Sequence, residues 1–202
     1  MSESLVTDRK RTLRASAVLK RSSLKATDTE TWSGIIQVKV LQSPPYLRSQ
    51  SVALYSPIQN EVDTAAIRDH ALATGKRVYY PRLAEGSSLE LVQVDRHRSF
   101  VVGRFGILEP VGDAEAFDDQ EGLLVIVPAL VFDHQGNRLG RGLGFYDRLL
   151  KGLSAEAVFM GLSYEFQLVD EVPAELWDQR VHYIITERRM IDCASSQSNL
   201  EV

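Results

Sequence analysis

The residues that could do chemistry gather in one glycine-rich segment between a hydrophobic run and an apolar helix. Four glycines and two arginines alternate there, and an aspartate follows: Gly136, Arg138, Gly140, Arg141, Gly142, Gly144 and Asp147. Glycine lets the backbone approach a ligand closely, and arginine offers forked donors that suit phosphate. Free N–H groups ahead of a helix also favour an anion, and an early helical carboxylate could hold Mg²⁺ beside it. The segment predicts a phosphate site; the alternative is a glycine-rich connection with solvated arginines.

Two common phosphate loops are excluded by the residues around the last glycine. A Walker loop needs Lys-Ser or Lys-Thr there, but Phe145-Tyr146 follows Gly144. The dinucleotide fingerprint needs two residues between its second and third glycines, whereas only Leu143 separates Gly142 from Gly144.

The elements that must position this segment predict an α/β fold. A strand at 51–55, a helix at 61–74 and a strand at 77–80 indicate a crossover and a parallel sheet. The most hydrophobic run, 123–127, should be the central strand. We expect a Rossmann-like, three-layer single domain over residues 1–192, with a mostly parallel sheet, helices on both faces and a flexible tail at 193–202. The remaining expectations are a helix from about 8 to 20, a polar connection at 21–34, an undecided segment at 35–41, a strand at 77–80 stopped by Pro81, strands at 89–94, 157–162 and 183–186, and a helix at 145–151.

Composition narrows the class of protein. The chain has 202 residues and a net charge of −4, which does not favour bulk binding to nucleic acid or anionic membranes. The single cysteine, Cys193, excludes an intramolecular disulfide. No apolar run approaches the ~18 residues of a membrane span, and no secretory signal is recognisable, so a cytoplasmic location is expected. Residues 1–25 nevertheless hold seven Lys or Arg against two acidic residues.

The segment from Pro128 to Arg148 resembles the signature of the 5-formyltetrahydrofolate cyclo-ligase (methenyltetrahydrofolate synthetase) family. Two departures are visible: Phe145 stands where the family usually has a tyrosine, and Leu143 where glycine or lysine is common. The resemblance implies an enzyme that uses ATP and Mg²⁺ to close 5-formyltetrahydrofolate, with or without a polyglutamate tail, to 5,10-methenyltetrahydrofolate. A monomer without nucleic-acid or membrane partners is expected.

Separate blocks extend the resemblance along the chain, and each implies a role. The ATP-binding residues implied are Lys10, Arg11, Thr12, Leu13, Arg14, Arg138, Leu139, Gly140, Arg141, Gly142, Leu143, Gly144, Phe145 and Tyr146. The folate-binding residues implied are Tyr55, Ser56, Glu61, Arg141, Gly142, Leu143, Gly144 and Phe145. Arg141 and Tyr146 are the catalytic candidates, and Asp147 with Asp178 would hold Mg²⁺. The alternatives are a solvated basic face for Lys10 and Arg14, a helix-terminus carboxylate for Glu61 and a surface aspartate for Asp178.

The implied reaction is phosphoryl transfer followed by ring closure. The formyl oxygen attacks the γ-phosphate of ATP, and N10 of the folate then displaces phosphate from the resulting imidoyl phosphate. The enzyme would align the reactants and neutralise charge. Two rivals stay open from the residues alone: a sugar-phosphate isomerase on a similar sheet, which would not need ATP, and a non-catalytic module whose basic N-terminus contacts RNA.

Overall fold

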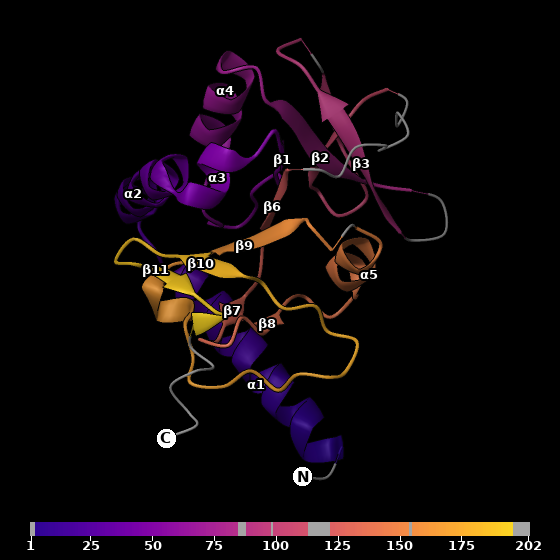
Figure 1. The fold of residues 1–202 in the computed structure, drawn as a ribbon. Coiled ribbons are helices and arrows are strands. Elements are labelled where there is room, and N and C mark those ends of the chain that lie inside the picture. Colours follow the sequence, from indigo (N-terminus) through magenta and orange to yellow (C-terminus); the bar gives the residue numbers. More distant parts are fainter. Residues whose placement is uncertain (1–2, 85–87, 98, 113–121, 154, 196–202) are drawn as a thin grey trace.

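The computed structural model describes residues 3–84, 88–97, 99–112, 122–153 and 155–195. Its core is a seven-stranded sheet of order β11-β10-β9-β6-β1-β2-β3 (Figure 1). The five inner strands pair in parallel, and the two edge strands are antiparallel. The mostly parallel sheet is therefore confirmed, and β6 is its central strand, buried along its whole length. The strands are β1 (Ser51–Ala53), β2 (Arg77–Leu83), β3 (Leu89–Val94), β6 (Leu123–Val127), β9 (Val158–Leu162), β10 (Tyr183–Ile185) and β11 (Met190–Asp192).

Helices cover both faces of the sheet, as expected. Val52 of β1 belongs to the apolar cluster that includes Ile36 and Ile67, from α2 (Ala26–Gln42) and α4 (Ala65–Ala73). The next residue, Ala53, points to the opposite face and clusters with Leu150 of α5 (Phe145–Lys151). Successive side chains of a strand alternate between faces, so the two clusters define three layers. The short helix α3 (Pro44–Arg48) lies on the α2 side.

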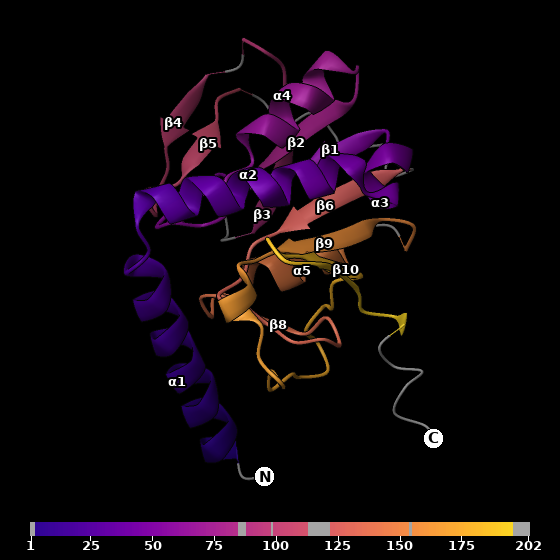
Figure 2. The same cartoon turned by 90° about the vertical axis from the view of Figure 1, so that its left-hand side faces the viewer.

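The first helix, α1 (Glu3–Ser22), stands apart from the layers. Figure 2 shows that α1 joins the start of α2 and projects downward from the body. Ala17 is buried in a small cluster with Leu130 and Leu139 at the hairpin of β7 (Val131–Phe132) and β8 (Arg138–Leu139): Leu130 precedes β7, and Leu139 is the last residue of β8. The helix is longer than the predicted 8–20 at both ends. No helix within the described ranges is both long and apolar enough to cross a membrane.

Two helix predictions were wrong. Residues 21–34 are not a connection, because α2 begins at Ala26; its buried stripe mixes Ser33 and Gln37 with Ile36 and Val40, which conceals the helical pattern. The helix predicted from Glu61 begins only at Ala65, after Thr64. Glu61 therefore lies in a loop, and the helix-terminus interpretation of its carboxylate is excluded.

Strand β2 continues through Pro81, which was expected to end it. The pairing with β1 stops at Tyr79, so beyond that point β3 is the one described strand that pairs with β2, and Pro81 pairs in register with Leu91. A proline is tolerated where one edge of a strand needs no donor.

Cys193, expected in a flexible tail, is buried and donates its N–H to the carbonyl of His182, whereas residues 196–202 lie outside the described ranges. The hairpins β7–β8 and β4–β5 (Phe100–Val102, Leu108–Pro110), the short helix η1 (Glu165–Gln167) and strand β11 were not predicted.

The order of the strands fixes where a ligand can enter. The chain moves from β1 outward to β2 and β3, then returns to β6 and moves the other way to β9 and β10. Open α/β sheets bind ligands at such a reversal, outside the carboxyl ends of the strands. Here those ends are Leu54 to Ser56 after β1 and Pro128 to Leu130 after β6.

Candidate active site

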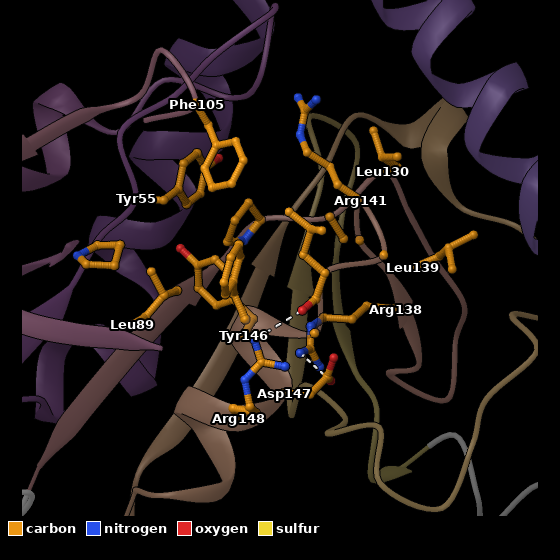
Figure 3. Close-up of a pocket in the computed structure, with 18 of the residues that line it drawn as sticks. Tyr55, Leu89, Phe105, Leu130, Arg138, Leu139, Arg141, Tyr146, Asp147 and Arg148 are labelled. Atoms are coloured by element: carbon orange, nitrogen blue, oxygen red, sulfur yellow. Dashed lines mark hydrogen bonds and ion pairs between the residues drawn. The ribbon is translucent and has the colours of Figure 1, made fainter. Parts of the chain in front are cut away.

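A cavity of about 670 Å³ opens at this reversal (Figure 3). Its lining comes from the segments after β1 and β6, the glycine segment, α5 and one face of α1. The lining residues divide into two walls. We call Lys10, Arg14, Arg138 and Arg141 the cationic wall, and Tyr55, Ser56 and Glu61 the Glu61 wall.

The first helix reaches the glycine segment directly. Arg14 Nε donates to the carbonyl of Gly140 at 2.9 Å, across 126 positions of sequence. Lys10 Nζ lies 3.5 Å from Glu175 Oε2 and 3.8 Å from Asp178 Oδ2. These two cations face the cavity, as the residue spacing of four requires of one helical face.

The three residues between Lys10 and Arg14 do not line the cavity. The Arg11 side chain is 79% exposed and pairs with Asp8 at 3.1 Å. The Thr12 hydroxyl donates to the Asp8 carbonyl, one turn earlier in the helix. Leu13 packs on the apolar cluster around Ala17. Of this predicted block, the structure brings only Lys10 and Arg14 to the site.

The glycine segment bends by left-handed residues. Gly142 has φ +95° and Gly144 has φ +65°, and a Cβ on Gly142 would lie 3.2 Å from Arg14 Nη2. Gly136 is a separate case, because it forms the β7–β8 turn and a side chain there would collide with the Val181 carbonyl. Since α5 has only seven residues, we assign anion attraction here to the arginines rather than to a helix dipole.

Arg138 is the buried member of the cationic wall. Its side chain is 4% exposed, and Nη2 donates to Asp147 Oδ1 at 2.7 Å (Figure 3). Nη1 donates to the Gln179 carbonyl, and the Gln179 N–H donates to the same Asp147 oxygen at 3.2 Å. Burial lowers the pKa of Arg138, and the Asp147 carboxylate opposes that shift. This arrangement anchors α5 to the segment after Trp177.

The two predicted metal ligands lie in the same cavity. Asp147 accepts from Arg138, and Asp178 accepts from the Glu175 N–H at 2.9 Å while pairing with Lys10. No cluster of three or more His, Cys, Asp or Glu suited to a metal occurs within the described ranges. Mg²⁺ characteristically takes one or two carboxylates and completes its octahedron with water and substrate phosphates. The donor set therefore fits Mg²⁺ held together with a nucleotide.

The Glu61 wall is fixed by hydrogen bonds to backbone groups. The Tyr55 hydroxyl donates to the Val62 carbonyl at 2.8 Å, and the Ser56 hydroxyl donates to the Leu108 carbonyl at 2.6 Å. Glu61 Oε2 accepts the Ile58 N–H at 3.1 Å. Burial raises the pKa of Glu61, and the nearby guanidiniums oppose that shift. The wall offers a mostly enclosed carboxylate as an acceptor for N–H groups of a ligand.

Arg141 joins the two walls. Its Nη2 donates to Gln59 Oε1 at 2.9 Å and lies 3.7 Å from Glu61 Oε1. Leu139 is buried beneath the segment, whereas Leu143 is exposed at the rim. Arg141 therefore lies between the Glu61 carboxylate and the glycine bend. A guanidinium in that position can contact one ligand on each wall, as a catalytic residue between two substrates must.

Aromatic rings close the cavity beside these charges. The rings of Phe105 and Phe145 have centroids 5.9 Å apart, and the Arg148 guanidinium lies 5.3 Å from the Phe145 centroid. Tyr146 points into the same space in Figure 3. Burial and then the negative charge of Glu61 raise the pKa of Tyr146, so its hydroxyl stays protonated and able to donate.

The sequence prediction did not include Arg21 and assigned no individual role to Phe105. Arg21 is 2% exposed and its Nη2 donates to Glu61 Oε1 at 3.3 Å. Its signal was available in the sequence, because Arg21 follows Arg14 by seven residues and so lies on the same face of α1.

Comparison with known proteins gives a consistent result. The sequence model of the 5-formyltetrahydrofolate cyclo-ligase family matches residues 6–187. The 5-formyltetrahydrofolate cyclo-ligase of Mycolicibacterium smegmatis is 35% identical, over 72% of this chain and 77% of that protein. The Escherichia coli K12 protein of the same name is 31% identical, over 75% and 86%. The solved structure of Aquifex aeolicus 5,10-methenyltetrahydrofolate synthetase superposes with a TM-score of 0.79 at 33% identity, covering 91% of this chain and 92% of that one.

Proposed function

Since the chain belongs to the 5-formyltetrahydrofolate cyclo-ligase family, we propose that ATP and 5-formyltetrahydrofolate meet in its central cavity and leave as ADP, phosphate and 5,10-methenyltetrahydrofolate. The chain is a cyclo-ligase enzyme of folate one-carbon metabolism. The observation that carries the proposed site is the bond from Arg14 to Gly140, because it gathers cations from distant segments around one glycine bend. A triphosphate is the ligand that such a concentration of guanidinium and ammonium groups suits.

The nucleotide is proposed to occupy the cationic wall. Lys10, Arg14 and Arg141 are accessible from the cavity and would neutralise phosphate oxygens, while Arg138 adds its charge from beneath. Asp147 and Asp178 would hold Mg²⁺, which when bound would offset charge on the phosphates. Lys10, the partner of Asp178, is a cation that the phosphates can attract instead.

The reduced pterin is proposed to occupy the Glu61 wall, beside the Phe105 and Phe145 rings. Glu61 would accept hydrogen bonds from pterin N–H groups, and the rings would cover one face and exclude water. Ser56 and Tyr55 line the wall, but both hydroxyls donate to backbone carbonyls, so they shape the pocket and support the loop.

The reaction then needs alignment and charge neutralisation at the junction of the walls. The formyl oxygen attacks the γ-phosphorus and ADP departs; N10 attacks the activated carbon and loses its proton, and phosphate departs with the former formyl oxygen. Arg141, which contacts Gln59 and lines the cavity, would neutralise the transferred phosphoryl group, and the protonated Tyr146 hydroxyl would donate to an oxygen of the reactants.

Formation of methenyltetrahydrofolate, followed by its absorbance with ATP and Mg²⁺ present, tests this function. We expect product only when ATP, Mg²⁺ and 5-formyltetrahydrofolate are all supplied. No product with active folate, or equal product without ATP, would refute the proposal. A monomeric state, a cytoplasmic location, use of polyglutamylated folate and the absence of a nucleic-acid partner stay predictions.

A further inference from the structure

Arg21 is the third cation on the face of α1 that carries Lys10 and Arg14. Separations of four and seven residues place the three on one side of a helix. Lys10 and Arg14 meet the open cavity, whereas Arg21 is enclosed, with 2% of its side chain exposed. Arg21 has no role in the proposed binding of ATP or in the proposed phosphoryl transfer.

Arg21 holds the Glu61 loop at two points. Its side chain donates to Glu61 Oε1 at 3.3 Å, and its carbonyl accepts from Asn60 Nδ2 at 3.0 Å. The loop needs such support, because Gln59 and Asn60 have φ of +50° and +59° without being glycine. Left-handed non-glycine residues persist when the surroundings over-determine them.

A structural role alone explains this pair poorly. A buried ion pair stabilises a fold weakly, and an apolar residue of similar volume is often as good or better. Ala17, on the same side of α1, packs in an apolar cluster. The pair has a geometric result, however: Arg21 and the Ile58 N–H hold Glu61 from the protein side, while Glu61 lines the cavity.

Resting on the function proposed above, we propose that Arg21 is a positioning residue that fixes the Glu61 carboxylate toward the reduced pterin. It does not touch the nucleotide or the reacting atoms. Its effect should therefore fall on folate binding and pass through Glu61.

The charged and titratable groups facing Glu61 come from four segments. They are Arg21 on α1, Arg141 in the glycine segment, Tyr55 after β1 and Tyr146 on α5. Burial raises the pKa of Glu61, with Arg21 the largest opposing influence and Arg141 a smaller one. Loss of the Arg21 cation would therefore raise that pKa further, and the carboxylate would be protonated at a higher pH.

The test compares Arg21→Met with Lys20→Met, a matched loss of the neighbouring, exposed cation. Both variants are assayed for methenyltetrahydrofolate formation with each substrate varied in turn. We expect Arg21→Met to raise the KM for 5-formyltetrahydrofolate about 10- to 100-fold, the range for a lost charged hydrogen bond, with the KM for ATP unchanged. The acidic limb of kcat/KM for folate should move to higher pH, and Lys20→Met should behave as wild type.

A double-variant cycle with Glu61→Gln separates positioning from general damage. If Arg21 acts through Glu61, adding Arg21→Met to Glu61→Gln changes folate KM by less than about twofold. Additive effects, an unmoved pH limb or equal changes in both KM values would overturn the proposal. Where Arg21→Met does not fold, Arg21→Lys decides: a raised folate KM with the ATP KM and the wild-type pH limb retained supports the assignment, and equal increases in both KM values refute it. Failure of the proposed function is distinct, since wild-type protein would then form no product.

Discussion

The two walls of the cavity hold their charges in different ways. On the Glu61 wall, a carboxylate is enclosed between Arg21 and the Ile58 N–H, and the loop that carries it is tied by further bonds. On the cationic wall, Lys10 and Arg141 are partly accessible, and Lys10 pairs with carboxylates at 3.5 and 3.8 Å. On the proposed function, the Glu61 wall is a preorganised surface for an organic ring, and the cationic wall is an exchangeable surface for a mobile polyanion and its metal ion. Only Arg138 departs from this division, since it is buried and bonded to Asp147.

The largest effect is expected from removal of Arg141, the residue of the cationic wall that reaches the Glu61 wall. Arg141→Met should lower kcat about 10³-fold, because a guanidinium at a transferring phosphoryl group contributes on that scale. Both KM values should also rise, since Arg141 contacts Gln59 and lies near Glu61. Steady-state assays with each substrate varied give the three constants. Arg141→Lys keeps the charge and should be intermediate; an unchanged kcat in the methionine variant would place the phosphoryl group elsewhere.

The Glu61 wall should impose the acidic limit of activity. On the proposed function, the ionised Glu61 carboxylate is the acceptor for pterin N–H groups, so kcat/KM for folate should fall as the pH drops through the pKa of Glu61. Burial raises that pKa above the ordinary 4.5, so the limb lies above this value. Glu61→Gln should lower kcat/KM about 10- to 100-fold and flatten the limb. No basic limb should come from Tyr146, whose pKa is raised by burial. A limb that survives in the glutamine variant would assign it to another group.

The two carboxylates of the cationic wall should separate metal binding from anchoring. Asp147→Asn and Asp178→Asn should each raise the Mg²⁺ concentration for half-maximal activity about tenfold. Only Asp147→Asn removes the charged partner of the buried Arg138, so it alone should lower the free energy of unfolding, by about 1 to 3 kcal/mol, the cost of a buried donor that loses its acceptor. Magnesium titrations and urea unfolding measure the two effects. Equal stability of the two variants would show that the Arg138 pair does not anchor the fold.

Salt should affect the walls unequally, with the smallest effect of the four. The KM for ATP should rise about threefold between ~0.05 and ~0.5 M KCl, because accessible cations are screened. The KM for monoglutamyl 5-formyltetrahydrofolate should change less, since the Glu61 pair is enclosed. Parallel titrations in potassium chloride and potassium glutamate control for a specific chloride effect. A larger change in the KM for folate than in the KM for ATP would contradict the assignment of the accessible cations to ATP.

The sequence predicted what short-range patterns encode and missed what tertiary contacts impose. The hydrophobic run of β6 and the glycine bend before α5 are local features, and both were placed correctly. Helix α2 was missed because Ser33 and Gln37 on its buried stripe are satisfied from outside the helix: Ser33 by Tyr164 and the Asp63 N–H, and Gln37 by the Ala66 N–H. Their partners are distant in the sequence, so no local pattern predicts those bonds.

The site residues that the sequence predicted correctly are also those that local patterns group together. Lys10, Arg14 and Arg138 line the cavity, because their spacing and their place beside the glycines already group them. Arg11, Thr12 and Leu13 fall on the other sides of α1, which a contiguous motif does not reveal. The pairing of Arg21 with Glu61 depends on a left-handed turn at Gln59 and Asn60, which has no glycine to mark it.

The hydrogen bond from Arg14 to Gly140 affects the order in which the protein can fold during its synthesis. A nascent chain emerging from the ribosome exposes its amino-terminal helix long before the glycine bend is synthesised, because 126 positions separate the two partners. Until then Arg14 has no Gly140 carbonyl to which it can donate, although Arg21 of the same helix can already meet Glu61. The earliest part of the polypeptide therefore acquires its final neighbours among the last, and catalytic competence arrives late in the assembly of the molecule.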